Sequence, residues 1–159
     1  MSESLSSSAQ RVQSALNEHN LELRVVELPG STRTSQEAAD TIGCEVSQIA
    51  KSIIFKGKES ETPILVIASG ENRISERKLK SVVGEKVEKP DAEFVLEETG
   101  YVIGGIPPVG HKNDIVTYID EDLMDHKVIW AAAGTPNALF SLTPQELLEI
   151  TNGEIIDVK

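Results

Sequence analysis

The segment IAKSIIFKGKESETPILVIAS, residues 49–69, decides the class of fold. It holds two short apolar runs, KSIIFK (51–56) and PILVIAS (63–69), separated by the polar stretch GKESET (57–62). Apolar runs of this length, rich in isoleucine and valine, are typical of buried strands. The polar stretch between them predicts a hairpin loop. We therefore expect the core of the protein to be built on a β-sheet that contains these two strands as neighbours.

The sequence on both sides of this hairpin mixes helical and strand patterns without strict alternation. Helices are expected at residues 8–19, 34–42, 73–84, 91–99 and 143–151, and further strands at 21–28, 114–120, 127–134, 138–142 and 153–158. Start and stop signals support the helices: Thr34 or Ser35 and Thr143 as caps, Pro144 at a first position, and glycines at several ends. The helix at 73–84 should turn its apolar residues inward, Val82 included.

These elements predict one α+β domain over residues 9–159, with a central mixed or largely antiparallel sheet of about six or seven strands flanked by helices. A chain of 159 residues suits a single domain. The serine-rich residues 1–8 are expected to be frayed.

Composition excludes several classes of protein. No apolar run approaches the roughly 18 residues of a membrane helix, and the polar start lacks the pattern of a secretory signal. Cys44 is the single cysteine, so neither a disulfide nor a cysteine-based zinc site is expected, and the residue is interpreted as a buried small hydrophobe. A cytoplasmic protein without a membrane partner is the simplest interpretation.

Net charge is −11, which argues against non-specific binding of nucleic acid through an overall basic surface. A local basic strip stays open as an alternative to an ordinary solvated surface. Its members fall in one third of the chain: Lys51, Lys56, Lys58, Arg73, Arg77, Lys78 and Lys80.

The common catalytic motifs are missing: the sequence has no G-x-S-x-G, no P-loop and no H-E-x-x-H. His19, His111 and His126 lie in polar stretches and are not expected to be catalytic. Lys51 stands out because it shares one face of a strand with Ile53 and Phe55. Such a lysine either extends along the surface to solvent or points into a cleft.

The stretch VIGGIPPVG, residues 102–110, fits neither a helix nor a strand. Gly104 and Gly105 let a backbone approach a ligand closely, and Pro107 and Pro108 stiffen it. Such a loop can present amide N–H groups to a carbonyl or an oxyanion; a tight structural turn is the alternative. A second glycine-bearing bend, AAAGTP (131–136), either leaves room for a ligand or allows close packing.

Taken in order, SQEAADTIG, QIAKSIIFK, ILVIASGENRIS, TGYVIGGIPPVG, IDEDL, WAAAGTP and SLTPQELLEI resemble the YbaK/ProX family, the prolyl-tRNA synthetase-associated editing domain. The resemblance runs from about Glu27 to Ile150. Its two most specific pieces are IAKSIIF and TGYVIGGIPPVG.

The resemblance implies a mixed sheet with flanking helices and a trans-editing deacylase, which hydrolyses the ester joining a wrong amino acid to its transfer RNA. It implies no metal and no cofactor. The implied partner is the acceptor end of an aminoacylated tRNA, with a synthetase as an optional second partner; no oligomeric state is implied. The implied catalytic residues are Lys51, Gly104, Gly105 and Pro108, and the implied substrate-binding residues are Ser52, Ile106, Pro107, Ala132, Ala133 and Gly134.

Three questions stay open from the sequence. Lys51 can act as an electrostatic stabiliser, a positioning group or a base. Family members that edit cysteine carry Ser-Gly-Gly where this chain has Ala132-Ala133-Gly134, which favours a small residue such as alanine or serine over a thiol-directed site. The net negative charge is compatible with two modes of tRNA binding. Either the protein contacts the tRNA only through the basic strip, or a synthetase holds the tRNA. A non-catalytic binding module that docks on a synthetase or regulator is the alternative function, and hydrolysis of a different activated ester is a third.

Overall fold

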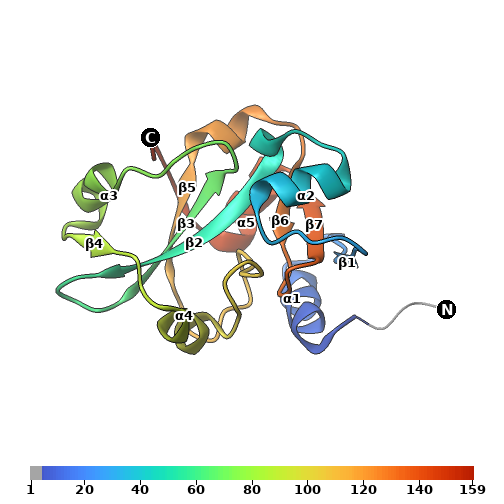
Figure 1. Cartoon of the computed structure of the whole chain (residues 1–159), viewed down its shortest axis with the longest axis horizontal. Helices are drawn as coiled ribbons and strands as arrows, with labels where there is room; N and C mark the ends of the chain where they lie inside the picture. Colours follow the sequence, from blue (N-terminus) through green and yellow to red (C-terminus); the bar gives the residue numbers. More distant parts are fainter. Residues whose placement is uncertain (1–4) are drawn as a thin grey trace.

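The computed structural model describes residues 5–159 and places the predicted hairpin at the centre of an eight-stranded sheet (Figure 1). The strand order is β1-β7-β6-β2-β3-β5-β8, and β4 pairs with one end of β2. The strands are β1 (Val26–Glu27), β2 (Ile49–Gly57), β3 (Pro63–Ser69), β4 (Val87–Glu88), β5 (Val116–Asp120), β6 (Ile129–Ala132), β7 (Ala138–Leu142) and β8 (Glu154–Ile156). Because β2 and β3 are antiparallel whereas β3 and β5 are parallel, the sheet is mixed, as predicted.

Five α-helices flank the sheet, which confirms the predicted α+β class. They are α1 (Ser7–Asn17), α2 (Ser35–Ile42), α3 (Glu76–Val83), α4 (Ala92–Thr99) and α5 (Pro144–Thr151). Thr34 and Thr143 form capping boxes at the starts of α2 and α5, and Gly43 ends α2 in the left-handed conformation. Local capping chemistry therefore fixes these boundaries close to where the sequence predicts them.

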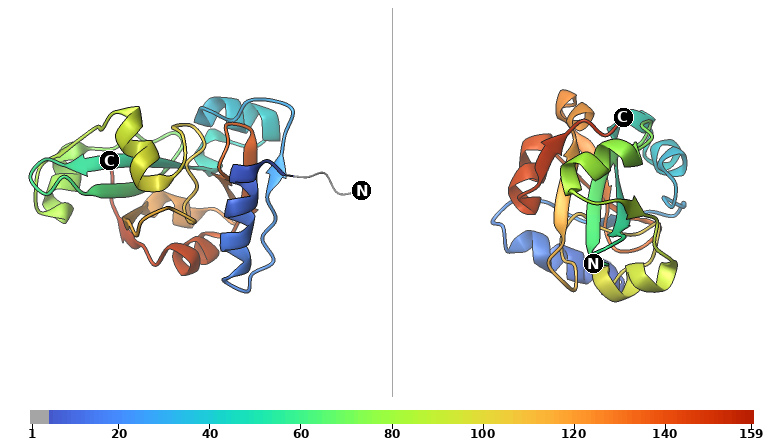
Figure 2. Two further views of the ribbon diagram at one scale, coloured as in Figure 1. Left: turned by 90° about the horizontal axis from the view of Figure 1, so that it is seen from below. Right: turned by 90° about the vertical axis from the view of Figure 1, so that its left-hand side faces the viewer.

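The two faces of the hairpin pack into different cores, since side chains alternate along a strand. One face, with Ile54 and Ile67, joins a cluster that includes residues of α1 and α5. The other face, with Phe55 and Val66, packs on Leu79 of α3. Figure 2 shows α1 and α5 together on one side of the sheet, with α2 on the other. Lys51, at the start of β2, is thereby on the α3 face.

The structure differs from the prediction near the N-terminus. The strand expected at residues 21–28 shrinks to Val26–Glu27. Its preceding backbone is bound instead by the side chain of Gln13, which accepts from the amide of Val25 and donates to the carbonyl of Leu23. Helix α1 begins at Ser7 with Ser6 as its cap, inside the segment expected to be frayed; residues 1–4 of that segment lie outside the described residues.

Two smaller differences concern the region around α3. Val82 is 38 % exposed, so the prediction that it faces inward is wrong, and Leu79 carries the contact instead. The two-residue strand β4 follows α3 and extends the far end of β2, at Lys56 and Gly57. A strand of two residues is too short to leave a periodic signal in the sequence.

Candidate functional site

The sheet opens between β2 and β6, and the opening forms a cavity of about 390 Å³. The two strands pair in parallel over only two positions, Ile49 with Trp130 and Ala50 with Ala131. Beyond Ala50 the loop after α4 and the segment before α2 close the gap. The cavity is lined by Thr32, Arg33, Thr34, Ser35, Ala38, Ile49, Ala50, Lys51, Ser52, Ile53, Gly70, Ile103, Gly104, Ile106, Ala132 and Leu139. It therefore brings together five residues that the resemblance implied: Lys51, Ser52, Gly104, Ile106 and Ala132.

Lys51 is half-buried at this cavity, and its ammonium donates a hydrogen bond to the backbone carbonyl of Asn72 at 2.6 Å. Asn72 follows the end of β3, the strand paired with β2. A lysine ammonium has three donors, so one bond leaves others for a ligand. Lys51 is thus held against Asn72 where the cavity meets a neighbouring hollow, which favours a position in a cleft over free extension into solvent.

A buried carboxylate stands behind this lysine. Asp120, at the end of β5, is 1 % exposed and accepts hydrogen bonds from the amide of Ser69 at 3.0 Å and the side-chain amide of Asn72 at 2.7 Å. Its other oxygen accepts from the amide of Asp122 at 2.9 Å. Because parallel strands β3 and β5 end at the same edge, Asn72 and Asp120 meet there and fix the carbonyl that holds Lys51.

The electrostatics of Lys51 combine opposing effects. Burial lowers the pKa of its ammonium below the ordinary value, the charge of Asp120 raises that pKa, and the nearby cations Lys89 and Arg73 lower it further. Desolvation is the largest of these effects. The site therefore holds a lysine whose proton is more easily released than that of a surface lysine, with a carboxylate that moderates the shift.

The glycines of the loop at residues 102–110 have different tasks. The amide of Gly105 donates to the carbonyl of Val102 at 3.0 Å, which closes a tight turn with Gly104 at φ +97°. A positive φ at this position requires glycine or a similar residue. The carbonyl of Gly105 accepts from the amide of Gly134 at 2.8 Å. Gly104 faces the cavity, whereas the amide expected from Gly105 is used within the loop.

Gly105 is needed for close packing of the loop against the bend after β6. A Cβ atom on Gly105 would lie 2.9 Å from three backbone atoms of Thr135. Gly134, also implied as a substrate contact, has φ +100° and approaches the backbone of Ser8 in α1. Ala133 is fully buried. These three residues support the cavity from behind and do not line it.

Pro107 and Pro108 are buried and do not line this cavity, and a histidine binds the first of them. The ring Nε2 of His111 donates to the carbonyl of Pro107 at 2.6 Å. Burial lowers the pKa of this imidazole, and the bond to Pro107 partly opposes that shift. His111 lines a polar cleft, in agreement with its polar sequence surroundings, and its ring is partly buried there.

Two hydroxyl groups at the cavity have no protein partner. Thr32 Oγ1 and Ser52 Oγ are buried and make no hydrogen bond within the described residues. Both residues line the cavity, whose other walls are largely apolar. An unsatisfied buried hydroxyl costs about 1–3 kcal/mol, and both oxygens are shielded from the open space of the cavity. Thr32 lies in a segment without any motif, so sequence reasoning did not find it.

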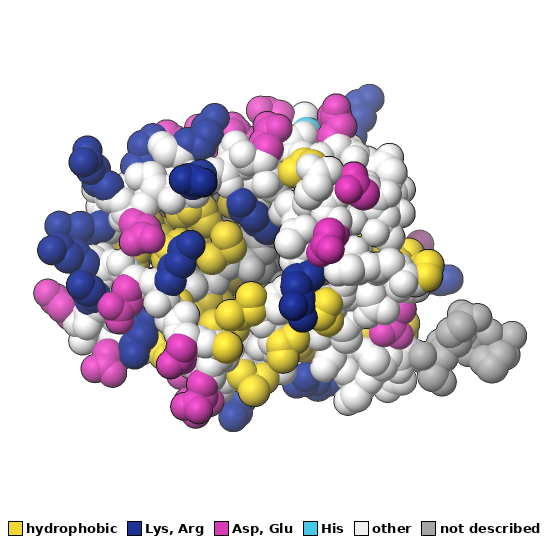
Figure 3. Space-filling view, in the orientation of Figure 1, with side chains coloured by type: hydrophobic (Ala, Val, Ile, Leu, Met, Phe, Trp, Pro, Cys, Tyr) yellow, Lys and Arg dark blue, Asp and Glu magenta, His cyan; other side chains and the backbone are white. Residues whose placement is uncertain are grey.

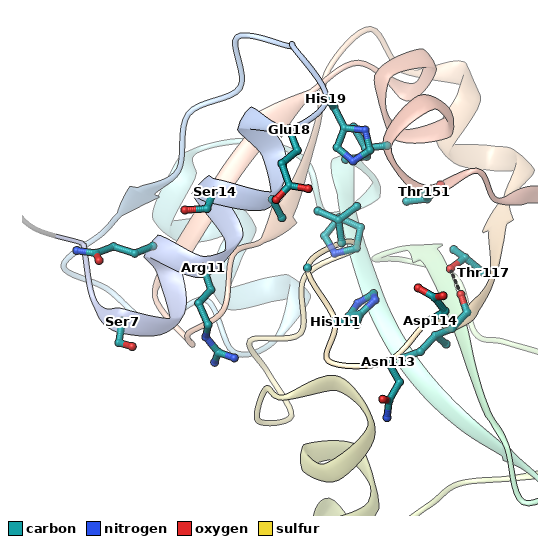
Figure 4. Close-up of a pocket in the computed structure, with 17 residues that line it drawn as sticks. Ser7, Arg11, Ser14, Glu18, His19, His111, Asn113, Asp114, Thr117 and Thr151 are labelled. Atoms are coloured by element: carbon teal, nitrogen blue, oxygen red, sulfur yellow. Dashed lines mark hydrogen bonds between the residues drawn. The ribbon is translucent and has the colours of Figure 1, made fainter.

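A larger cleft of about 720 Å³ lies elsewhere, between α1 and residues 108–115 (Figure 4). Its labelled side chains are polar and come from several elements, among them Arg11, Glu18, His19, His111 and Asp114. Of the residues implied by the resemblance it contacts only Pro108. The predicted site residues therefore gather at the smaller cavity.

Comparisons with known proteins agree with this arrangement. The family model described as "Aminoacyl-tRNA editing domain" matches residues 30–150. The protein YwhH of Bacillus subtilis (strain 168) is 36 % identical over 152 residues, covering 95 % of this chain and 96 % of its own. A crystal structure of "a putative trans-editing enzyme for prolyl tRNA synthetase" superimposes with a TM-score of 0.92 at 48 % identity, covering 98 % of this chain and 99 % of that one.

A third relative is the "Putative Cys-tRNA(Pro)/Cys-tRNA(Cys) deacylase EbsC" of Enterococcus faecalis (strain ATCC 700802 / V583), 27 % identical over 126 residues, which cover 79 % of this chain and 76 % of its own. The protein belongs to the aminoacyl-tRNA editing domain family. The resemblance found from the sequence is thereby confirmed, and so are the α+β fold and, at the level of the family, an aminoacyl-tRNA deacylase as the class of enzyme. Among the described residues, every helix is too short or too polar to cross a membrane.

Proposed function

We propose that the protein is a trans-editing deacylase that hydrolyses the ester of a mischarged tRNA carrying a small amino acid. Alanine, serine and cysteine on tRNA(Pro) or a related tRNA are the candidate substrates. The observation that carries this proposal is the cavity at Lys51, which combines an anchored ammonium, apolar walls and two unpartnered hydroxyls. A cytoplasmic location follows from the same proposal, because that is where its substrate is made.

The size of the cavity supports a small substrate. Its volume of about 390 Å³ is at the low end of ligand sites, and Ile103, Ile106 and Leu139 narrow it. Ala132 stands where cysteine-editing relatives have serine, which favours alanine or serine, whereas the name of EbsC keeps cysteine among the substrates to test.

The chemistry requires only modest catalysis, because aminoacyl esters are activated. Water adds to the ester carbonyl, and the carbonyl oxygen becomes an oxyanion. The Lys51 ammonium stabilises that charge, a contribution of about 10²- to 10³-fold for one well-placed donor. The carbon–oxygen bond to the terminal ribose then breaks, and the ribose hydroxyl leaves with a proton. The products are the free amino acid and uncharged tRNA.

The test is deacylation of a panel of correctly and wrongly charged tRNAs, beginning with alanyl-, seryl- and cysteinyl-tRNA(Pro). Wild type is compared with Lys51→Ala and with Lys127→Ala, which removes an exposed lysine that is not part of the cavity lining. We expect fast release from at least one mischarged species, lost in Lys51→Ala and kept in Lys127→Ala. Binding of charged tRNA without hydrolysis would instead support the non-catalytic binding module. An acidic surface suits such a module better than it suits a tRNA-hydrolysing enzyme.

A further inference from the structure

Positive charge in this acidic protein is concentrated in one segment. Residues 51–89 contain nine of the fifteen Lys and Arg residues but only six of the twenty-six Asp and Glu residues. That segment therefore carries a formal charge of +3, and the rest of the chain carries −14, which together give −11. Such a division of charge is typical of a protein that meets an anionic partner on one face only.

The fold arranges these cations along a track that starts at the cavity. A hollow of about 630 Å³ shares Lys51, Ile53 and Gly70 with the cavity and adds Arg73 and Lys89. A further hollow of about 210 Å³ shares Glu76 with that one and is lined by Lys58, Arg77, Lys80, Lys86, Glu76 and Val87. Figure 3 shows dark blue side chains around a hollow with an apolar floor and over the neighbouring side of the molecule.

The cations of the far hollow are free to contact a partner. Lys58, Arg77, Lys80 and Lys86 are all exposed, and none of them forms a salt bridge within the described residues. Lys78, on the same helix, pairs with Asp157 and does not line the hollow. We call Lys58, Arg77, Lys80 and Lys86 the distal basic cluster.

We propose that this track binds the sugar–phosphate backbone of the RNA acceptor end, with the single-stranded terminus at Lys51, Arg73 and Lys89 and the paired stem at the distal basic cluster. The inference rests on the proposed function, since it takes tRNA as the substrate. Strand β2 links the two ends: Lys51 and Lys58 are seven residues apart along it and the following turn, about 23 Å in an extended chain. A terminus of a few unpaired nucleotides covers a distance of this order.

The test compares two triple variants with the same change in charge. Arg77→Ala/Lys80→Ala/Lys86→Ala removes three cations of the distal basic cluster, and Arg24→Ala/Lys112→Ala/Lys127→Ala removes three exposed cations outside residues 51–89. Two substrates are used: full-length charged tRNA and a trinucleotide that carries the same amino acid on its terminal adenosine. For the distal variant we expect the ratio of kcat/KM on full-length tRNA to kcat/KM on the trinucleotide to fall about tenfold at low salt.

Salt dependence and binding give independent readouts. Each lost phosphate contact should reduce the slope of log affinity against log salt by about 0.7–0.9, so the distal variant should lose about 2 to 3. Affinity is measured on uncharged tRNA, so the surface is tested even if no hydrolysis occurs. The inference would be overturned if the distal variant kept the wild-type kcat/KM ratio and salt slope, or if the control variant lost as much as the distal variant. Wild-type deacylation would still support the proposed function in either case. If the distal variant loses tRNA binding but the wild type hydrolyses no charged tRNA, the proposed function is refuted and the RNA-binding surface is still supported.

Discussion

Two of the cavities that the described residues form, the large cleft beside α1 and the smaller cavity at Lys51, differ in what surrounds them, and the proposed active site is the smaller one. The cleft beside α1 is larger and polar, and its enclosed titratable group, His111, is occupied in holding Pro107. The cavity at Lys51 is smaller and mostly apolar, yet it holds an anchored ammonium and two buried hydroxyls without partners. A few polar groups held in a confined, mostly apolar space indicate a ligand site better than volume does.

The largest effect on deacylation is expected from substitution of Lys51, and it would distinguish the roles of the two cavities. Lys51→Met keeps the apolar stem and removes the charge, and should lower kcat/KM for deacylation by about 10²- to 10³-fold. Lys51→Arg keeps a charge that does not titrate. If the ammonium acts by its charge, wild-type activity falls as pH rises through the lowered pKa of Lys51, and the arginine variant loses this fall. Activity that instead rises with pH through that pKa would identify Lys51 as a base.

The next effect concerns the loop that closes the smaller cavity. Gly105→Ala places a methyl group against the backbone of Thr135, which cannot move aside as a flexible side chain would. Overpacking of this kind costs about 1–3 kcal/mol of folding stability, and the loop should move away from the bend after β6. We expect a lower thermal midpoint together with a loss of deacylation.

Gly84→Ala is the matched control, because it strains a left-handed backbone at the end of α3 with nothing within 4 Å. It should cost about 1–2 kcal/mol and leave kcat/KM per folded molecule unchanged. Equal loss of kcat/KM in both variants would show that the position of Gly105 has no special bearing on the cavity.

The third effect tests the carboxylate behind Lys51. Asp120→Asn keeps the shape of the side chain but places amide hydrogens against the N–H groups of Ser69 and Asn72, which themselves donate. The carbonyl of Asn72 should therefore shift, and kcat/KM should fall about tenfold. Because Asp120 raises the pKa of Lys51, its loss should move the alkaline limb of the pH profile to lower pH. Asp157→Asn, which breaks the surface pair with Lys78, is the control. An unchanged pH profile would deny Asp120 a role in positioning or tuning Lys51.

These residues also show where sequence-based prediction stops. Periodicity and caps located the central hairpin and all five helices, because those signals are local. The motifs IAKSIIF and GGIPP pointed to the candidate site but did not divide its residues into those that line the cavity and those that support it. Gly104 and Gly105 are adjacent, yet one faces the cavity and the other packs on Thr135.

Contacts between distant segments were outside the reach of local patterns. Asp120 meets Asn72 only because β5 lies parallel to β3, and Thr32 reaches the cavity from an irregular segment before α2. Polar residues just past two strand ends, in IASGEN and YIDED, were the available signal for Asn72 and Asp120. That signal needs the strand order, which the sequence alone did not provide.

A smaller effect is expected from His111, which lines the larger cleft and donates to the carbonyl of Pro107. Burial lowers the pKa of His111 below its ordinary value of about 6.5, so the unfolded chain takes up this proton first as pH falls. Stability should therefore decline from about pH 6.5 downward, through the lower pKa of the folded state. His111→Gln should flatten that decline, measured as the denaturation midpoint between about pH 7 and 5. Glu18, His19, Asp114 and Arg11 line the same cleft, and His19→Gln controls for them; an equal flattening there would remove His111 as the cause.

The smallest effect is expected in the larger cleft itself. His19→Ala and Asp114→Asn alter exposed side chains that line it and make no contact with the Lys51 cavity. If activity belongs to the smaller cavity, both variants should deacylate mischarged tRNA within about twofold of wild type, as surface substitutions usually do. A loss of activity comparable to that of Lys51→Met would reverse the comparison, because it would place the reacting groups in the larger cleft. Cavity volume would then be the better guide to the active site.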